Sequence, residues 1–463
     1  MAYGRTIAAI STPSGKGGVA IIRISGDDAI RVGDAVFRPR CKRPLSTLAP
    51  RTQIYGDILN GGVCVDDGMA TVFRAPKSYT GEDIVEISCH GGILVTRTVL
   101  ESVLAAGAVP AEAGEFTSRA FINGRLTLTE AEAVGDLLEA KSREQIRLAS
   151  GASRERLSRY VAEIREGLTS LLSSTFARID YPDEDLGDFT NEECISGLND
   201  IKIRIERLMA TYPTGKAISE GIRTVIVGKT NVGKSTLYNA ILGEDAAIVT
   251  DIEGTTRDVL TREAPLGRVM LNLSDTAGVR SEERADAVER IGIERTRAAI
   301  SRAELVIAVF DGSRIADDED IELLKTLADV TCPKIAIISK SDLARKFDTP
   351  LDQHGFDGVI ELSVCADELS AVKKLASTVE ALFTDEKIAV GECAIVSSAR
   401  HNASLIRALA FVNAAIEAFA SGIYADAAAS EIERALGAIS ELDGRAVTED
   451  VVSDIFSKFC VGK

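Results

Sequence analysis

The chain has 463 residues, enough for two or three domains with substantial cores, and a net charge of −17 at pH 7. That acidity excludes a broad nucleic-acid-coating surface, so any RNA contact must be local or made by a partner. The eight cysteines include no C-x-x-C pair and the three histidines allow no zinc spacing, which is typical of reduced thiols in a cytoplasmic protein. No run approaches eighteen apolar residues, so we expect neither a signal peptide nor membrane contact.

Residues 1–120 are expected to form a small α+β domain. Glycine clusters separate short apolar runs that predict strands over residues 6–10, 19–24, 70–73 and 84–88. After the last cluster, the apolar spacing predicts a helix over residues 93–106. The glycine-rich stretch at 15–18 lacks the lysine-serine ending of a phosphate-binding loop, and we interpret it as a turn.

From Leu126 to Ile179 the pattern becomes helical. Apolar residues recur on one face at three- to five-residue steps, namely Leu157, Val161, Ile164, Leu168, Leu171 and Phe176. Six arginines lie among acidic residues, which favours a solvated helix face over an RNA-facing patch: Arg143, Arg147, Arg154, Arg156, Arg159 and Arg165. A second amphipathic helix is predicted over residues 197–210, and the stretch 212–215 is interpreted as a domain boundary.

Residues 216–384 alternate strands with helices, as a doubly wound parallel sheet does. Further helices are predicted over residues 400–419, 425–437 and 451–459, and we expect them to pack against the earlier helices. The sequence therefore predicts a discontinuous helical domain, residues 121–215 and 385–463, with an α/β domain, residues 216–384, inserted into it.

The inserted region contains Gly228-Lys-Thr-Asn-Val-Gly-Lys234-Ser235, which fits the phosphate-binding loop G-x-x-x-x-G-K-[ST]. An apolar run at 224–227 precedes it and helical spacing over 236–242 follows, which is the context that the motif requires. The backbone N–H groups of such a loop bind phosphates, Lys234 reaches the β- and γ-phosphates, and Ser235 ligates Mg²⁺. The loop predicts a nucleoside triphosphate site.

Three later stretches identify the nucleotide as GTP. Residues 250–258 form a hydroxyl-rich loop at switch I distance, and Asp275-Thr-Ala-Gly278 has the D-x-x-G form that senses the γ-phosphate. Ser339-Lys-Ser-Asp342 lies where a GTPase places N-K-x-D, and Asp342 would accept both guanine N–H donors, although Ser339 replaces the usual asparagine and puts one buttressing contact in question. The expected GTP-binding residues are Asn231, Val232, Gly233, Lys234, Ser235, Thr236, Thr250, Asp251, Ile252, Glu253, Gly254, Thr255, Thr256, Asp275, Thr276, Ala277, Gly278, Lys340 and Asp342.

The hydrolysis mechanism has two alternatives from these residues. Val279 follows the D-x-x-G motif where Ras-like enzymes have glutamine, so another group must position the water. Asn231 and the oxygen-rich loop at 250–256 could seat a monovalent cation beside the phosphates. Alternatively, Asn231 only shapes the loop and Arg257 or Arg280 supplies the positive charge.

The chain resembles the MnmE (TrmE) family of tRNA-modification GTPases close to end to end. The matching stretches are Thr12–Gly18, Arg23–Gly26, Thr80–Glu86, His90–Gly92, Gly114–Thr117, Arg119–Asn123, Ile248–Asp251, Val288–Glu294 and Phe459–Lys463. The resemblance implies homodimers in which an N-terminal folate-binding and dimerisation domain precedes the helical domain, with a Ras-like G domain inserted into the latter.

The resemblance also implies a function. With an FAD-dependent partner (MnmG, or GidA) in a heterotetramer, the family adds an aminomethyl or carboxymethylaminomethyl group at C5 of the wobble uridine of certain tRNAs, and 5-formyl-tetrahydrofolate or a related reduced folate supplies one carbon. Its G domains pair in a K⁺-dependent way, which stimulates hydrolysis and favours the cation alternative. By motif, Mg²⁺ would bind Ser235 and Thr256, K⁺ would bind Asn231, Thr250, Ile252 and Thr255, and Glu289 would help to place the attacking water.

The family's folate contacts map to Arg23, Glu86, Arg125 and Lys463, where Arg125 replaces a usual lysine and alters the geometry. Without the family, Arg23 and Glu86 would be interpreted as ordinary surface charges. Cys460 matches a cysteine of the family's terminal motif and either acts chemically or helps to fix the tail; its ending does not fit a lipidation box. The alternative function is a G-protein switch that binds a partner without modification chemistry of its own, while the charge of −17 disfavours a ribosome-assembly GTPase.

Overall fold

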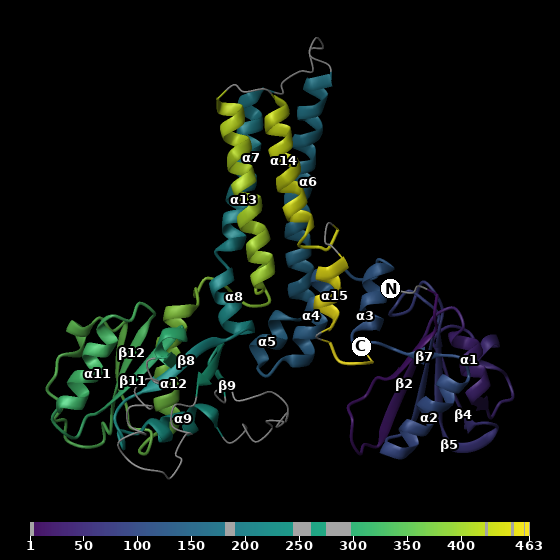
Figure 1. Ribbon diagram of the computed structural model, residues 1–463, viewed down its shortest axis with the longest axis horizontal. Helices are drawn as coiled ribbons and strands as arrows, with labels where there is room; N and C mark the ends of the chain where they lie inside the picture. The colour runs from purple at the N-terminus through teal and green to yellow at the C-terminus, as the bar shows by residue number, and fades with distance from the viewer. Residues whose placement is uncertain are drawn as a thin grey trace. The chain divides into compact units, whose positions relative to one another are not determined.

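The computed structural model describes residues 4–180, 190–243, 261–274, 298–421, 425–445, 449–457 and 459–462 (Figure 1). These residues belong to two compact units, one made of residues 1–138 and 437–463 and the other of residues 139–436. The contacts thus group the C-terminal end of the chain with the N-terminal sheet. The division into an N-terminal, a helical and a G domain is a different partition of the chain, and it stays a prediction.

The first unit contains a seven-stranded sheet in the order β3-β4-β5-β6-β2-β1-β7. All neighbours are antiparallel except β1 and β7. The strands are β1 (Ile7–Ile10), β2 (Val19–Ser25), β3 (Phe37–Pro39), β4 (Thr52–Asn60), β5 (Val63–Phe73), β6 (Ile84–His90) and β7 (Val109–Pro110). Sequence periodicity predicted β1, β2, β6 and only the last four residues of β5, and it missed β3, β4 and β7. Strands β3 and β7 are too short to show an alternation.

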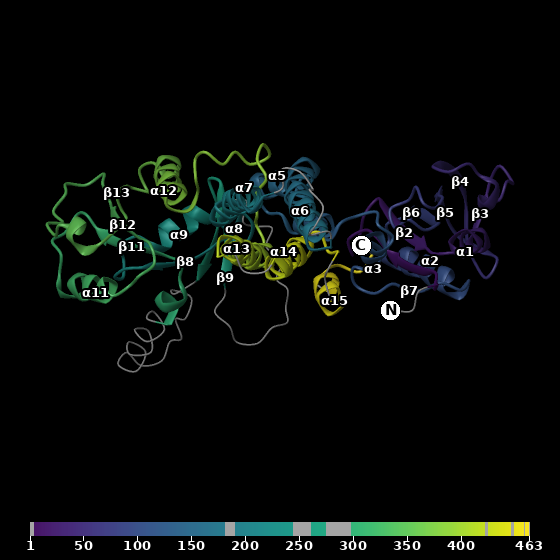
Figure 2. The same cartoon turned by 90° about the horizontal axis from the view of Figure 1, so that it is seen from above.

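Helices α1 (Ala29–Val36) and α2 (Ile93–Ala105) pack on the sheet and share its core (Figure 2). Alternate residues of β2, namely Ala20, Ile22 and Ile24, face that core, because successive strand residues point to opposite faces. Arg23 therefore points to the other face, where α3 (Glu115–Ile122) contributes Phe116 to a second, smaller cluster.

The C-terminal segment completes this unit. Phe456 of α15 (Glu449–Ser457) is buried against Leu128 and Ala131 of α4 (Leu128–Glu139). Beyond α15, Val461 pairs with Ala113, and the Ser11 hydroxyl donates a 3.0 Å hydrogen bond to the Gly462 carbonyl. Gly462 has a φ of +99°, and a Cβ there would lie 2.2 Å from the Ile10 carbonyl oxygen, so this position requires glycine.

The second unit contains a helical part. Its helices are α5 (Arg143–Leu148), α6 (Gly151–Asp180), α7 (Asn191–Met209), α8 (Tyr212–Ser219), α13 (Ala399–Ala420) and α14 (Ala425–Ser440), whose last residues belong to the first unit. Helix α7 packs against both α6 and α13 (Figure 1). By length and composition, α13 is the one helix among the described residues that could cross a membrane, and in this unit Leu405, Ala408 and Val412 on one of its faces are buried.

Several sequence predictions for these helices hold and three need correction. Leu157, Val161, Ile164 and Leu168 are buried as predicted, but Phe176 is 39% exposed because Thr175, seven residues after Leu168, lies on the buried stripe instead. The interpretation of 212–215 as a boundary missed α8, in which proline occupies the first turn, where it is tolerated. Helix α7 begins six residues earlier than predicted, at a capping box of Thr190 and Glu193.

The same unit contains a six-stranded sheet in the order β13-β12-β11-β8-β10-β9. All neighbouring strands are parallel except β9, which is antiparallel to β10. Its strands are β8 (Ile222–Val227), β9 (Thr261–Leu266), β10 (Val269–Ser274), β11 (Leu305–Asp311), β12 (Lys334–Ser339) and β13 (Gly358–Glu361). Alternate residues of β11 are buried in two separate cores, one on each face, as expected for a parallel sheet covered on both sides. Helices α9 (Lys234–Leu242), α11 (Asp318–Ala328) and α12 (Glu368–Phe383) accompany it.

Candidate functional site

The phosphate-loop motif connects β8 to the N-terminus of α9. Gly228 has a φ of +146°, and a Cβ there would lie 2.4 Å from the Val309 carbonyl oxygen, so the loop passes too close to β11 for any side chain. Gly233, at φ +102°, begins α9, and Asn231 adopts a φ of +61°, which asparagine tolerates better than most residues. This geometry turns the loop sharply into the positive end of a helix, as phosphate binding requires.

Lys234 turns back over this loop. Its Nζ donates hydrogen bonds to the carbonyl oxygens of Gly228 at 2.7 Å and Lys229 at 2.5 Å. Burial lowers the pKa of Lys234 from its usual value, because removing the ammonium from water disfavours its charged form. A phosphate group in the loop would therefore meet a partly dehydrated ammonium, whose attraction to an anion is stronger than that of a solvated lysine.

A cavity of about 940 Å³ opens at the carboxyl ends of the central strands. Open α/β sheets bind ligands in this position, and the volume is within the ordinary range for small-molecule sites. Eight of the sequence-predicted GTP-binding residues line this single cavity, although they come from two distant stretches: Asn231, Val232, Gly233, Lys234, Ser235, Thr236, Lys340 and Asp342. The structure brings them together, and their role in binding GTP stays a prediction.

Ser339 connects the two stretches. It is buried, and its hydroxyl lies 2.6 Å from the Val232 carbonyl oxygen of the phosphate loop and 3.0 Å from the Phe310 carbonyl oxygen of β11. Serine therefore contacts the phosphate loop directly from the position where the motif usually has asparagine. A hydroxyl has one hydrogen to share between these two acceptors, whereas an asparagine amide has two.

Lys340 is held by a carboxylate behind the cavity wall. Its Nζ lies 2.5 Å from the carboxylate of buried Asp311, which also accepts hydrogen bonds from the backbone and hydroxyl of Ser313. Burial by itself raises the pKa of Asp311, but the hydrogen bonds from Lys340 and Ser313 outweigh burial and hold this pKa below its usual value. Lys340 has a φ of +57°, and the ion pair helps to fix this uncommon backbone next to Asp342.

One side of the cavity was not predicted from the sequence. Ser363, Val364 and Cys365, which follow β13, also line it. Their backbone is joined to the Asp342 loop by a hydrogen bond from the Ser341 N–H to the Leu362 carbonyl at 3.3 Å. Only one signal in the sequence could have found them, namely their position after the next parallel strand, where the carboxyl ends of strands meet.

The remaining predicted residues of the nucleotide site lie outside the described residues. They are Thr250, Asp251, Ile252, Glu253, Gly254, Thr255, Thr256, Asp275, Thr276, Ala277, Gly278 and Glu289. Within the described part of the chain, the hydroxyl of Ser235 is the predicted Mg²⁺ ligand and Asn231 the predicted K⁺ ligand, both next to the cavity. Hydroxyl and amide oxygens suit these hard cations.

In the first unit, Arg23 and Glu86 form a half-buried ion pair, so their interpretation as ordinary surface charges is wrong. They are directly opposite each other on β2 and β6, with the Arg23 Nε 2.8 Å from a Glu86 carboxylate oxygen. The Arg23 guanidinium also lies 5.4 Å from the centre of the Tyr79 ring and 5.6 Å from that of Phe116. A charged pair beside two aromatic rings is a suitable wall for a flat, polar ligand.

Of the other predicted residues in this unit, Arg125 donates a 3.2 Å hydrogen bond from its Nε to the Ser78 carbonyl. Cys460 is exposed, and its carbonyl oxygen is 3.5 Å from the Gly114 N–H, so its backbone helps to fix the tail. Lys463 lies outside the described residues. No distance therefore connects Lys463 to the other three predicted folate contacts.

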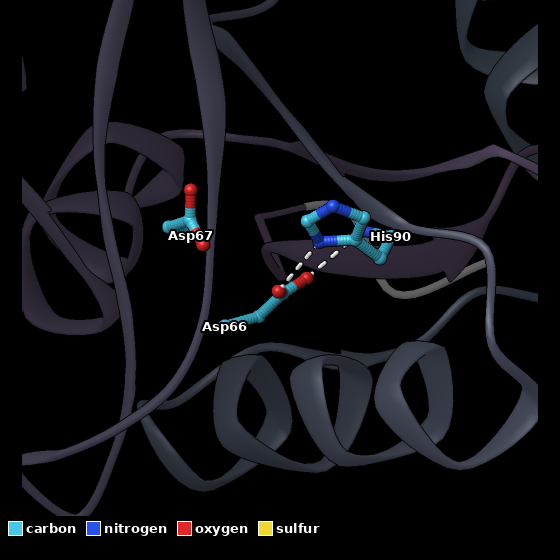
Figure 3. A group of neighbouring side chains, drawn as sticks. All are labelled: Asp66, Asp67 and His90. Carbon is cyan, nitrogen blue, oxygen red and sulfur yellow. Dashed lines mark hydrogen bonds and ion pairs between the residues drawn. The ribbon is translucent and has the colours of Figure 1, made fainter.

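A further cluster, which the sequence analysis did not single out, contains Asp66, Asp67 and His90 (Figure 3). Both Asp66 carboxylate oxygens are already engaged by His90, one by its backbone N–H at 2.8 Å and one by its Nδ1 at 2.7 Å. Asp67 follows Asp66 on β5 and bonds to the Tyr55 hydroxyl instead. The hydrogen bond to Asp66 raises the pKa of His90, which favours the imidazolium, so the group fits an ion pair better than a metal centre.

Comparisons with known proteins agree with this arrangement. Two family models match the chain, described as "MnmE helical domain" over residues 128–460 and "GTP-binding protein TrmE N-terminus" over residues 6–125. Relatives described as "tRNA modification GTPase MnmE" include one from Heliobacterium modesticaldum, 40% identical with coverage of 99% of this chain and 100% of the relative, and one from Clostridioides difficile, 36% identical with 99% of each covered. The solved G domain of the T. maritima FeoB iron transporter is 24% identical, with a TM-score of 0.26, and the match covers 34% of this chain and 96% of that one. The chain therefore belongs to the MnmE (TrmE) family of tRNA modification GTPases.

Proposed function

We propose that the protein is a K⁺-dependent, GTP-hydrolysing tRNA modification enzyme of the cytoplasm. As a homodimer joined to an FAD-dependent partner of the MnmG (GidA) family, it would add a carboxymethylaminomethyl or aminomethyl group at C5 of the wobble uridine of certain tRNAs. The observation that carries this proposal is the single cavity shared by the phosphate loop and the Asp342 loop, in a chain that matches this family along its whole length.

The cavity supports a division of tasks in GTP binding. Asp342 would accept the two guanine N–H donors. Lys234, whose ammonium is already partly removed from water, would turn from the loop carbonyls to the β- and γ-phosphates. Ser235 would contribute its hydroxyl to Mg²⁺. Asn231, together with Thr250, Ile252 and Thr255, would contact K⁺, which would supply positive charge beside the phosphates while Glu289 orients the water.

The half-buried pair in the first unit supports the folate part of the proposal. Arg23 and Glu86 would bind the polar edge of a reduced folate such as 5-formyl-tetrahydrofolate, and Tyr79 and Phe116 would offer aromatic surface to its ring. Arg125 and Lys463 would contribute further positive charge, which suits the carboxylates of the folate tail. The N-terminal folate-binding domain and the inserted G domain are both part of this proposal.

The test has two parts, one on the purified protein and one in cells. GTP turnover is measured in KCl and in NaCl at equal ionic strength, and equal rates would remove the potassium mechanism. Mass spectrometry of tRNA from cells lacking the protein is expected to show the unmodified wobble uridine. Return of the modification with the wild-type protein but not with Arg23→Ala/Glu86→Ala would support the folate site, whereas intact modification with that variant would favour the G-protein switch.

A further inference from the structure

The connection between β3 and β4 is basic in an otherwise acidic protein. Five basic residues and no acidic residue lie between Asp34 and Asp57, namely Arg38, Arg40, Lys42, Arg43 and Arg51, and all five are exposed. A chain with a net charge of −17 repels polyanions over most of its surface, so such a segment stands out as a local exception.

Two of these residues have a structural explanation. Arg38 and Arg40 flank Pro39 on β3, which is an edge strand of the seven-stranded sheet (Figure 2). Both pair with Asp57 of β4, at 3.5 Å and 2.8 Å. Charged residues and proline on an edge strand discourage pairing with other chains, and Asp57 offsets part of their charge.

The other three residues, Lys42, Arg43 and Arg51, have no such explanation. Among the described residues, no carboxylate lies within ion-pair distance of any of them. Lys42 and Arg51 also adopt φ angles of +60° and +61°, which are uncommon for residues with long side chains. We call these three residues the basic turn.

The basic turn is held firmly on the sheet. Leu45 and Leu48, which lie between Arg43 and Arg51, are buried in the core, and the Asp34 carboxylate accepts hydrogen bonds from the backbone N–H groups of Leu45 and Ser46. The Arg51 N–H donates to the Val72 carbonyl oxygen at 2.6 Å. The three charges are therefore presented from a fixed backbone, which reduces the conformational entropy lost when a ligand binds.

We propose that the basic turn binds the phosphate backbone of the tRNA substrate. This inference rests on the proposed function, and it gives that function a place on the molecule where tRNA makes contact. Lysine and arginine contacts to phosphate position a nucleic acid without reading its sequence, which suits an enzyme that acts on several tRNAs. Tyr55, 44% exposed under the Arg40 guanidinium, adds an aromatic surface beside the turn.

A membrane surface fits the basic turn less well. Binding at a lipid interface usually needs exposed apolar side chains next to the positive charges. Within residues 38–51, no large apolar side chain is exposed, because the leucines of this segment face the core. An anionic lipid surface is therefore an outcome that the experiment must separate from RNA.

The experiment measures the binding of fluorescently labelled, unfractionated tRNA to the full-length protein between about 50 and 200 mM KCl. The affinity of both proteins should fall as the salt concentration rises. If three phosphate contacts are lost, the fall for Lys42→Gln/Arg43→Gln/Arg51→Gln over this range should be smaller than the fall for the wild type by a factor of roughly 20 to 40. GTP turnover without tRNA should be unchanged, because the variant residues lie in the other unit from the nucleotide cavity.

Two controls isolate the position from the charge. Lys373→Gln/Lys374→Gln/Lys387→Gln removes the same three charges from exposed positions elsewhere and should bind tRNA as the wild type does. Lys42→Arg/Arg43→Lys/Arg51→Lys keeps the charges and should retain the wild-type salt dependence.

Three results would overturn the proposal. One is an unchanged salt dependence in the glutamine variant of the basic turn, and another is an equal loss in the displaced-charge control. The third is that the glutamine variant of the basic turn loses binding to vesicles of phosphatidylserine and phosphatidylcholine while it still binds tRNA, which would assign the turn to membranes. If tRNA binding is insensitive to the turn while wild-type protein still restores wobble-uridine modification in cells, the basic turn fails and the proposed function stands.

Discussion

The nucleotide cavity and the Arg23–Glu86 pair differ in how their parts are distributed along the chain. The phosphate side of the cavity is one continuous loop, residues 228–235, whose glycines impose its shape. The ion pair exists only because β2 and β6 align in one register, which brings together residues 63 positions apart. A site formed by one turn can be read from one motif, whereas a site formed by strand register depends on the whole sheet.

This contrast predicts the largest effect at the continuous loop. Lys234→Ala should lower GTP turnover by a factor on the order of 10² to 10³, because it removes a preorganised positive charge from the phosphates. Phosphate release at saturating GTP measures the effect. Lys325→Ala, at an exposed position of α11, is the control, and a comparable loss there would show that the effect is not local.

In the first unit, the C-terminal tail also depends on contacts between residues that are far apart in the sequence, since Gly462 lies against Ile10 and Ser11. Gly462→Ala should destabilise the first unit by about 1 to 3 kcal/mol, since the new Cβ would collide with the Ile10 carbonyl and the φ of +99° disfavours alanine. Urea unfolding measures the free energy. Gly61→Ala, which has a positive φ but open space around it, should cost less; equal costs would mean that backbone strain alone matters.

Ser339 extends the comparison, because its hydroxyl joins the continuous phosphate loop to the end of β12, before the Asp342 loop. Ser339→Ala should weaken GDP binding about threefold to tenfold, as it leaves the Val232 and Phe310 carbonyls without this donor. Ser339→Asn, with two amide hydrogens, should bind GDP at least as tightly as the wild type. Titration with a fluorescent GDP analogue tests both variants, with Ser341→Ala as control. Wild-type affinity in Ser339→Ala would show that the contact between Ser339 and Val232 does not support nucleotide binding.

The smallest effect is expected at His90 and concerns pH. The pKa of His90 is raised by Asp66, so the stability from this pair is fully present below the unfolded pKa of histidine and is lost as pH rises through the higher folded pKa. The midpoint temperature of thermal unfolding of the wild type should therefore fall slightly as pH rises from the unfolded to the folded pKa of His90. The His90→Gln variant should lack this pH-dependent fall. NMR titration of His90 provides the direct check, and an unshifted pKa would contradict it.

The sequence predicted much of the fold where the pattern is local. The strands around the phosphate loop and helices α2, α6 and α13 follow from apolar spacing, and the glycines of residues 228–235 predict the loop between β8 and α9. The predicted second helix begins at Gly197, whereas α7 begins at Asn191 and contains this glycine, which lies against Leu171, where a Cβ would come within 3.0 Å of the leucine. Close packing between helices, which the linear pattern does not contain, decided that position.

The candidate site was predictable in the same uneven way. Lys234 and Asp342 lie in motifs, and the structure brings both to one cavity. The side formed by Ser363–Cys365 has no recognisable motif, and Arg23 lies against the rings of Tyr79 and Phe116, which are far from it in the sequence. Side chains supplied by tertiary contacts are therefore the ones that sequence analysis placed wrongly or not at all.

The docking of the C-terminal segment on the N-terminal sheet has a consequence for how the chain is made. The first unit needs residues 437–462, and these are synthesised only after the roughly 300 residues of the second unit. At ordinary rates of translation, the nascent sheet waits about 15 to 60 s before Phe456 can reach Leu128 and the tail can bond to Ser11. During that interval Phe456 does not cover Leu128 and Ala131, so this apolar surface is open to a chaperone.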